Sequence, residues 1–264
     1  MTLDTGVGLE RGGDGAAPAQ PPRAEAVAAR LARNAGARGG ARLLVSVRDV
    51  REALAAAAAG ADLIDLKEPD AGALGAVPLH VVHEVVQALR AAGHAQPVSA
   101  TVGDFPAGAA REALLERVRA TAACGVDLVK VGIARGDGTT ALLAALAGSP
   151  AAVVPVFFAD EGLDEALLAL ACWLRFPALM LDTADKRAGS LPDVLDAVAL
   201  RHFIGRVRGA GKLAGVAGSL RLAHIPLVRE LAPDIAGFRG AACADGRGSA
   251  LDPQRVATLA AEFR

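Results

Sequence analysis

The chain has 264 residues, a formal net charge of −1 and 53% apolar residues, with one tryptophan and no tyrosine. The near-neutral charge and the scarcity of aromatic residues argue against the basic footprint and stacking surface of a nucleic-acid-binding protein. This length fits one large domain or two small ones, and α/β barrels often reach it as a single domain.

The sequence also indicates where the protein works. Its longest apolar runs are interrupted by charge or glycine before about 18 residues, so we expect no transmembrane helix. The N-terminus lacks the apolar core of a signal peptide. Three widely separated cysteines have neither zinc nor disulfide spacing and predict free thiols. We expect a cytoplasmic protein that binds neither nucleic acid nor membrane, and a homo-oligomer is compatible with the sequence.

Two regions differ in composition. Residues 1–40 are rich in glycine, alanine and proline and have little to bury, which predicts a flexible N-terminal extension. From residue 41 to 264, short apolar runs alternate with helical patterns. The predicted strands cover residues 43–47, 62–67, 97–103, 127–133, 152–158, 178–183, 213–220 and 235–240. The predicted helices cover residues 49–59, 78–92, 108–123, 138–147, 163–175, 191–203, 221–231 and 252–263.

Eight strand–helix units predict a TIM (β/α)8 barrel as the catalytic domain. The strands are nearly continuous apolar runs, as expected for parallel strands covered on both faces. An open doubly wound sheet is the alternative, but no G-x-G-x-x-G motif opens the first helix. In a barrel, catalytic residues lie at the C-terminal ends of the strands.

Lysine is rare in this chain: only Lys67, Lys130, Lys186 and Lys212 occur among 28 basic residues. The first three fall at or near predicted strand ends, whereas Lys212 precedes a strand and is expected to be solvated or ion-paired. Unlike arginine, a lysine can lose its proton and attack a carbonyl to form an imine. Burial and a neighbouring cation both lower the pKa of a lysine from its ordinary value of about 10.4.

Two carboxylates accompany these lysines. Asp65 lies two residues before Lys67 and points to the same side of the strand, where it could bind Lys67 or relay a proton. Asp182 ends the sixth strand. Structural ion pairs inside the barrel, such as Lys130 with either carboxylate, are the alternative. Several charges inside a barrel are costly unless they pair or serve a purpose, so the cluster favours a catalytic site.

The ends of strands seven and eight are candidates for phosphate binding, since barrels commonly bind phosphate there. Small residues expose backbone N–H groups, although turn formation alone would also favour them. Arg239 could contact phosphate or pair with a core carboxylate, and Arg247 is a weaker candidate. The predicted phosphate-binding residues are Gly218, Ser219, Arg239, Gly240 and Ala241.

Other polar residues at strand ends are ambiguous. Ser46, Thr101 and Asp104 could bind substrate hydroxyls or form structural caps. The glycine-rich loop after Lys67 is a candidate substrate-covering segment. The five histidines form no cluster with metal-ligand spacing, and we expect neither a metal nor a cofactor.

Several segments together resemble the (5-formylfuran-3-yl)methyl phosphate synthase family, also called 4-(hydroxymethyl)-2-furancarboxaldehyde-phosphate synthase. The likeness covers about residues 42–250 and is most specific in D-x-K-x-P-x-x-G-x-L-G. It is carried, in chain order, by LLVSVRDVREALAAAAAGADLIDLKEPDAGALGA, SATVGD, GVDLVKVG, MLDTADK, AGSL and GFRGAAC-x-x-GR.

The resemblance implies a TIM-barrel lyase that condenses two molecules of glyceraldehyde 3-phosphate to a furan aldehyde phosphate, with loss of phosphate and water. The product feeds the furan ring of methanofuran-type one-carbon carriers. The resemblance places the Schiff-base lysine at Lys67 and a proton acceptor at Lys130. It places further residues of the chemistry at Asp65, Lys186 and Asp182. A Schiff-base aldolase or sugar-phosphate isomerase, or a non-catalytic sugar-phosphate-binding barrel, remains an alternative function.

Overall fold

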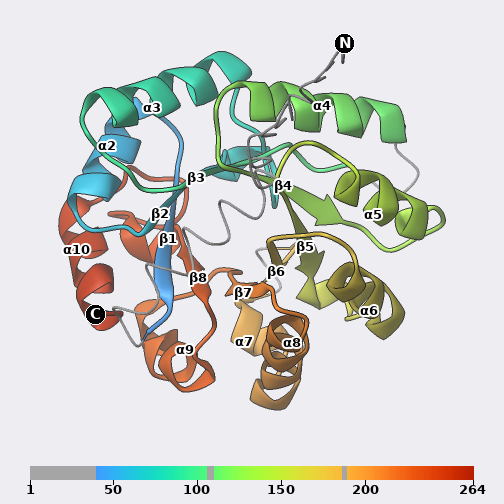
Figure 1. Ribbon diagram of the computed structural model, residues 1–264. Helices are drawn as coiled ribbons and strands as arrows, with labels where there is room; N and C mark the ends of the chain where they lie inside the picture. Colours follow the sequence, from blue (N-terminus) through green and yellow to red (C-terminus); the bar gives the residue numbers. More distant parts are fainter. Residues whose placement is uncertain (1–39, 106–109, 186–188) are drawn as a thin grey trace, which may run out of the picture.

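The computed structural model describes residues 40–105, 110–185 and 189–264. Residues 1–39 of the predicted N-terminal extension lie outside the described residues, and so does Lys186. Eight parallel strands form a closed barrel in chain order, and β1 pairs with β8 to complete it. Helices surround the barrel on its outer side (Figure 1). The structure therefore confirms the predicted TIM (β/α)8 fold.

The strands begin and end close to the predicted positions. They are β1 Arg42–Val47, β2 Leu63–Leu66, β3 Val98–Thr101, β4 Leu128–Ile133, β5 Val153–Phe158, β6 Ala178–Asp182, β7 Leu213–Val216 and β8 Ile235–Phe238. Strand β7 is shorter than the predicted 213–220, because Gly218 and Ser219 adopt positive φ angles of 108° and 48° and turn the chain.

The helices follow the strands in the expected order. The α-helices are α2 Val50–Ala58, α3 Leu79–Ala91, α4 Arg111–Ala123, α5 Thr139–Ala147, α6 Glu165–Trp173, α7 Leu191–Val194, α8 Ala197–Gly209, α9 Ile225–Leu231 and α10 Pro253–Glu262. Short 3₁₀ helices are η1 Pro69–Ala71, η2 Ala159–Glu161, η3 Leu222–His224 and η4 Gly240–Ala242.

One predicted helix is wrong in its extent. The segment expected as a single helix over 191–203 is divided into α7 and a longer α8, which ends at Gly209. The division occurs because Leu195 is extended and Asp196 starts a new helix, with its side chain accepting a hydrogen bond from the Ala199 N–H. An aspartate at this position is a strong N-cap.

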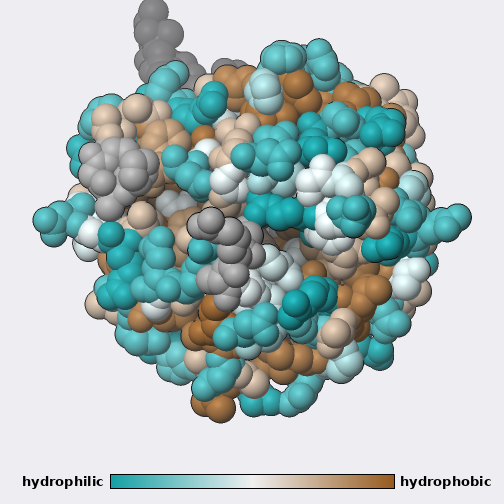
Figure 2. Space-filling view, turned by 180° about the vertical axis from the view of Figure 1, so that it is seen from behind, coloured by the Kyte–Doolittle hydropathy of each residue, from teal (hydrophilic) through white to brown (hydrophobic). Residues whose placement is uncertain are grey.

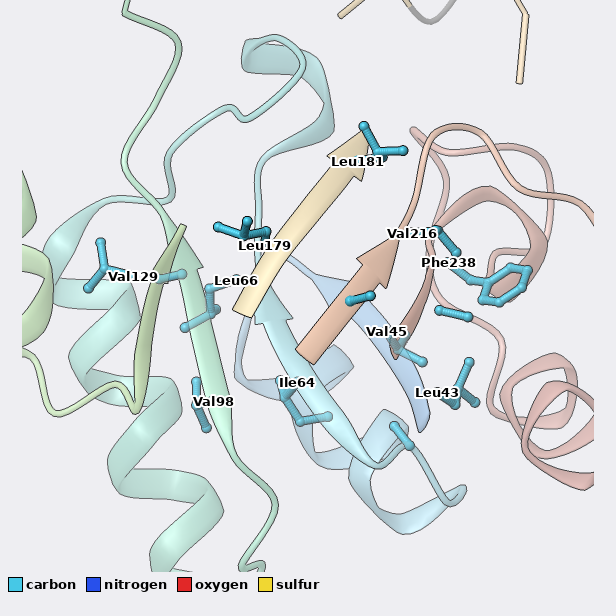
Figure 3. Close-up of a cluster of buried hydrophobic side chains, with 14 of the residues drawn as sticks. Leu43, Val45, Ile64, Leu66, Val98, Val129, Leu179, Leu181, Val216 and Phe238 are labelled. Atoms are coloured by element: carbon cyan, nitrogen blue, oxygen red, sulfur yellow. The ribbon is translucent and has the colours of Figure 1, made fainter. Parts of the chain in front are cut away.

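The apolar residues form two separate cores. Outward-facing strand residues such as Leu43, Ile64 and Leu181 pack beneath the helices (Figure 3). Inward-facing residues such as Leu63, Val154 and Met180 pack together inside the barrel. This division follows from the alternation of side chains along a strand. The barrel interior therefore holds an apolar cluster of its own, and the buried polar groups Asp65 and Lys130 lie among inward-facing positions of the same strands.

Aspartates at the N-terminal ends of three strands fasten the preceding strand. Each accepts a backbone N–H at 2.8 to 2.9 Å, in the pairs Asp62 with Leu43, Asp127 with Val98, and Asp234 with Ala214. Asp62 and Asp127 therefore have a structural role in joining neighbouring strands. These carboxylates lie at the barrel end opposite to the expected catalytic mouth, where they support the fold.

The outer surface is mainly polar in the view from behind. Figure 2 shows hydrophilic residues over most of this face, with hydrophobic residues interspersed among them. Within the part of the chain that the structure describes, no helix has both the length and the apolarity required to cross a membrane.

Candidate active site

A carboxylate in the middle of the barrel organises the first half of the site. Asp65 is fully buried and accepts hydrogen bonds from Ser46 Oγ at 3.0 Å and Ser99 Oγ at 2.6 Å. Lys130 Nζ lies 3.0 Å from Asp65 Oδ2. The register of the strands places Ser46, Asp65 and Ser99 side by side, so the three side chains meet in one layer. Burying this carboxylate is tolerable because a cation and two hydroxyl groups satisfy it.

A second ion pair lies at the C-terminal end of the barrel. Lys67, which follows β2, places its Nζ 3.1 Å from Oδ2 of Asp182 at the end of β6. The backbone N–H of Thr183 donates to Asp182 Oδ1 at 2.8 Å and fixes the carboxylate. Because β2 and β6 lie on opposite sides of the closed barrel, this pair spans the C-terminal end of the barrel.

The pairing differs from one sequence-based interpretation. Asp65 was a candidate partner of Lys67, but it binds Lys130, and Lys67 is bound by Asp182. The cause is barrel geometry: Asp65 lies one layer below Lys67, where the neighbouring polar side chains come from β1, β3 and β4. The structure therefore brings Lys67, Lys130, Asp65 and Asp182 together in two lysine–carboxylate pairs.

A cavity of about 720 Å³ opens at this end of the barrel. Lys67, Lys130 and Asp182 lie in its wall, and Asp65 is not among the described residues that line it. The opposite wall is formed by the loops after β7 and β8. All five predicted phosphate-binding residues line the cavity, namely Gly218, Ser219, Arg239, Gly240 and Ala241.

The turn after β7 requires a glycine. Gly218 has φ of 108°, and a Cβ there would lie 3.1 Å from both Thr183 Cγ2 and Leu191 Cβ. Gly218 also accepts a hydrogen bond through its carbonyl from the N–H of Leu191. The tight packing fixes the backbone of this loop against the segment after β6, and Gly218, which has no side chain, lines the cavity.

The guanidinium of Arg239 is hydrogen-bonded to other residues of the protein. Its Nη atoms donate to Glu52, to Ser46 O and to Ser249 O, and its Nε donates to Arg247 O. These contacts use all five N–H groups of the guanidinium. The alternative interpretation, pairing with a buried carboxylate, is thus what the structure contains, and Arg239 shapes the loop after β8.

Glu52 completes this ion pair from α2. Burial alone would raise the pKa of Glu52, but the hydrogen bonds and charge of Arg239 and the N–H groups of Arg48 and Leu251 outweigh it, so the pKa is lowered. The ion pair lies between α2 and the loop after β8, where Glu52 and Arg239 have exposed side-chain fractions of 2% and 9%. This ion pair joins the loop after β8 to α2.

The loop after Lys67 is fastened at several points. Asp104 accepts the N–H groups of Ala73 at 2.7 Å and Leu74 at 2.9 Å. Thr101 Oγ1 donates to Gly75 O at 2.8 Å. From the other side, Arg247 donates to the carbonyl oxygens of Pro69 and Gly72. Thr101 and Asp104 therefore support this loop, which the sequence indicated as a candidate substrate-covering segment.

Two residues that bind members of the candidate site are not indicated by the sequence analysis. Ser99 lies on the inward side of β3, and its spacing of two from Thr101 was the available signal. Glu52 lies in an alanine-rich helical run, where a lone carboxylate on the buried face was the signal. Among the described residues, no group of three or more His, Cys, Asp or Glu side chains could hold a metal ion.

A closed (β/α)8 barrel with two carboxylate-paired lysines lining a cavity at its C-terminal end is the architecture of a TIM-barrel enzyme. A family model described as 4-HFC-P synthase matches residues 43–260. The chain belongs to this family of synthases, which act on small molecules.

The relatives carry the same family name. A putative (5-formylfuran-3-yl)methyl phosphate synthase of Methylorubrum extorquens is 40% identical, with 84% of this chain and 92% of the relative covered. The (5-formylfuran-3-yl)methyl phosphate synthase of Methanosarcina mazei is 32% identical, with coverage of 84% and 98%. That of Methanococcus maripaludis is 35% identical, with coverage of 77% and 90%.

Solved structures of other proteins share the fold. Phosphoribosyl anthranilate isomerase from Thermus thermophilus has a TM-score of 0.60 at 15% identity, with 84% of this chain and 97% of that chain covered. A 3-hexulose-6-phosphate synthase has a TM-score of 0.53 at 19% identity, with coverage of 84% and 100%. At these identities the likeness supports the barrel fold alone.

Proposed function

We propose that the protein is a (5-formylfuran-3-yl)methyl phosphate synthase that condenses two molecules of glyceraldehyde 3-phosphate through a lysine Schiff base. One phosphate and water are lost, which makes the enzyme a phosphate-eliminating carbon–oxygen lyase. The product serves a methanofuran-type one-carbon cofactor in the cytoplasm. The observation that carries this proposal is the presence of two separately paired lysines in one cavity, together with the family membership.

Lys67 is the proposed nucleophile. Its side chain is 11% exposed at the cavity wall, whereas that of Lys130 is only 3% exposed. Asp182 lies 3.1 Å from Lys67 Nζ and is positioned to accept the proton that the amine must lose. Attack of the neutral amine on the aldehyde carbon forms a carbinolamine, and loss of water gives the imine.

Lys130 and Asp65 are the proposed proton-transfer pair. Lys130 lines the cavity and can exchange a proton with the substrate, while Asp65 holds its Nζ from below at 3.0 Å. Asp65 is thus a positioning residue in this mechanism. Lys186, outside the described residues, is proposed as a further proton shuttle on the strength of the family resemblance.

Cationic groups favour a phosphorylated substrate. Besides the two lysines, the guanidinium-bearing residues Arg221, Arg247 and Arg255 line the cavity. The backbone of Gly218, Ser219, Gly240 and Ala241 is the proposed phosphate cradle, with Arg239 supporting the loop instead of binding the anion directly. Charge-assisted hydrogen bonds to phosphate are among the stronger polar contacts in proteins.

The test is incubation of the purified chain with glyceraldehyde 3-phosphate alone. We expect inorganic phosphate to be released together with an aldehyde that absorbs in the ultraviolet. An aldolase or isomerase would give neither phosphate nor the absorbing aldehyde. A binding barrel would bind the substrate without turnover. Either result would contradict the proposed function.

A further inference from the structure

Ser46 occupies a position that the mechanism above does not use. It lies in β1, its exposed fraction is 7%, and it is among the residues that line the cavity. It is directly opposite Asp65 in the β1–β2 register. Ser99 is its counterpart on β3, with an exposed fraction of 1%, and is not among the described residues that line the cavity.

The hydrogen bond to Asp65 fixes the polarity of Ser46. Oγ donates its proton to Asp65 Oδ2 at 3.0 Å, and the same oxygen atom is paired with Lys130. A carboxylate in an ion pair offers acceptors only, so the single hydroxyl proton of Ser46 is committed to it. The lone pairs of Ser46 Oγ therefore remain for the cavity, which makes Ser46 an acceptor toward a ligand.

The strand that carries Ser46 lies beside the strand that leads to the proposed nucleophile. The backbone N–H of Lys67 donates to Val47 O at 3.0 Å, so Lys67 is joined directly to the residue after Ser46. Lys67 and Ser46 line the same cavity, so a substrate whose aldehyde carbon is held by Lys67 can place its next carbon beside β1. In glyceraldehyde 3-phosphate that carbon bears a hydroxyl group.

We propose that Ser46 is a substrate-binding and specificity-determining residue, whose Oγ accepts a hydrogen bond from the hydroxyl adjacent to the aldehyde of the bound triose phosphate. This inference rests on the proposed function and specifies which substrate group one wall of the cavity recognises. Because the neighbouring walls present the cations Lys67 and Lys130, an acceptor at Ser46 selects a ligand with a hydroxyl at that carbon over its deoxy analogue.

The test uses two ligands that lack a carbonyl and therefore form no imine. These are sn-glycerol 3-phosphate and 3-hydroxypropyl phosphate, which differ only in the middle hydroxyl. Isothermal titration calorimetry gives the ratio of their dissociation constants. We expect the wild type to favour sn-glycerol 3-phosphate by about fivefold, the effect of one net hydrogen bond. Ser46→Ala should bind both ligands alike, and Ser46→Thr should restore the preference.

Ser99→Ala is the matched control. Like Ser46→Ala, it removes one hydroxyl that donates to Asp65, but it removes no group from the cavity wall. A purely structural role for Ser46 predicts that both alanine variants change the ligand ratio equally, and this result would overturn the proposal. Retention of the preference by Ser46→Ala, or a wild type without preference, would overturn it as well. Imine formation is measured separately, so these results leave the proposed function unaffected.

Discussion

The Nζ of Lys130 lies 3.0 Å from Oδ2 of Asp65 in the middle of the barrel, where the exposed side-chain fractions are 3% and 0%. The other cavity lysine, Lys67, is bound by Asp182 from the opposite side of the mouth. The four charged side chains therefore form a deep pair, Lys130 with Asp65, and a shallow pair, Lys67 with Asp182. This division is the structural basis for assigning proton transfer to the deep lysine and imine formation to the shallow one.

Removal of one partner of the deep pair should destabilise the fold strongly. Asp65→Asn leaves the Lys130 ammonium buried without a countercharge, and we expect the free energy of unfolding to fall by roughly 3–5 kcal/mol, as for other broken buried pairs. Urea denaturation followed by circular dichroism measures this change.

The double variant Asp65→Asn with Lys130→Met is the matched control, because it removes the stranded charge. We expect it to recover most of the lost stability while remaining inactive. A single Asp65→Asn variant as stable as the wild type would contradict the assignment of a tightly coupled pair.

The sequence predicted the barrel and the cavity residues better than it predicted their partners. Strand count and the position of residues at strand ends placed Lys67, Lys130 and Asp182 at the mouth. Both the number of strands and the position of a residue within a strand can be predicted from local sequence patterns. The Lys67–Asp182 contact joins residues 115 positions apart, and it depends on which strands face each other after the barrel closes. No local pattern contains that information.

The same limit applies to Arg239. Its residue type at a strand end was compatible with a phosphate ligand, but its carboxylate partner is 187 residues away on α2. Helical patterning marks Glu52 as one position in an alanine-rich run, without showing that it meets the loop after β8. The break between α7 and α8 at Leu195 is likewise not predicted, because an aspartate such as Asp196 can lie inside a helix as well as at its start.

The Glu52–Arg239 pair should make stability depend on pH. The pKa of Glu52 is lowered from its ordinary value of 4.5 in the folded protein, so the ionised carboxylate stabilises the fold above that value. This contribution is lost as the pH falls through the lower folded-state pKa. We expect Glu52→Gln to cost about 3 kcal/mol at pH 7, with the difference from wild type shrinking below pH about 4.5.

Denaturation of both proteins between pH 3 and pH 8, spanning the carboxyl titration range of roughly 4 to 5, measures this dependence. Glu116→Gln is the control, since Glu116 pairs with Arg119 on the exposed surface of α4, where ion pairs contribute little. A constant gap between wild type and Glu52→Gln across the range would argue against the ionised pair.

The loop after Lys67 should become mobile when Asp104 is removed. Its carboxylate accepts the N–H groups of Ala73 and Leu74, so Asp104→Ala leaves both amides without this acceptor. We expect faster hydrogen exchange at these two amides by at least tenfold, corresponding to a loss of about 1.4 kcal/mol of local stability. The Michaelis constant should rise because the loop lines one side of the mouth.

Hydrogen-exchange mass spectrometry of the peptides over 68–77 provides the measurement. Asp70→Asn, in the exposed part of the same loop, is the control and should leave the exchange of Ala73 and Leu74 unchanged. Equal protection in Asp104→Ala and wild type would show that the loop is held by other contacts.

The most direct test of the central claim is reductive trapping of the imine. The protein is treated with glyceraldehyde 3-phosphate and borohydride, digested, and mapped by mass spectrometry. We predict one covalent adduct, located on Lys67, and its absence from Lys67→Arg, which keeps the positive charge near Asp182 but cannot form an imine. An adduct on Lys130, no adduct at all, or turnover by Lys67→Arg would contradict this account of the site.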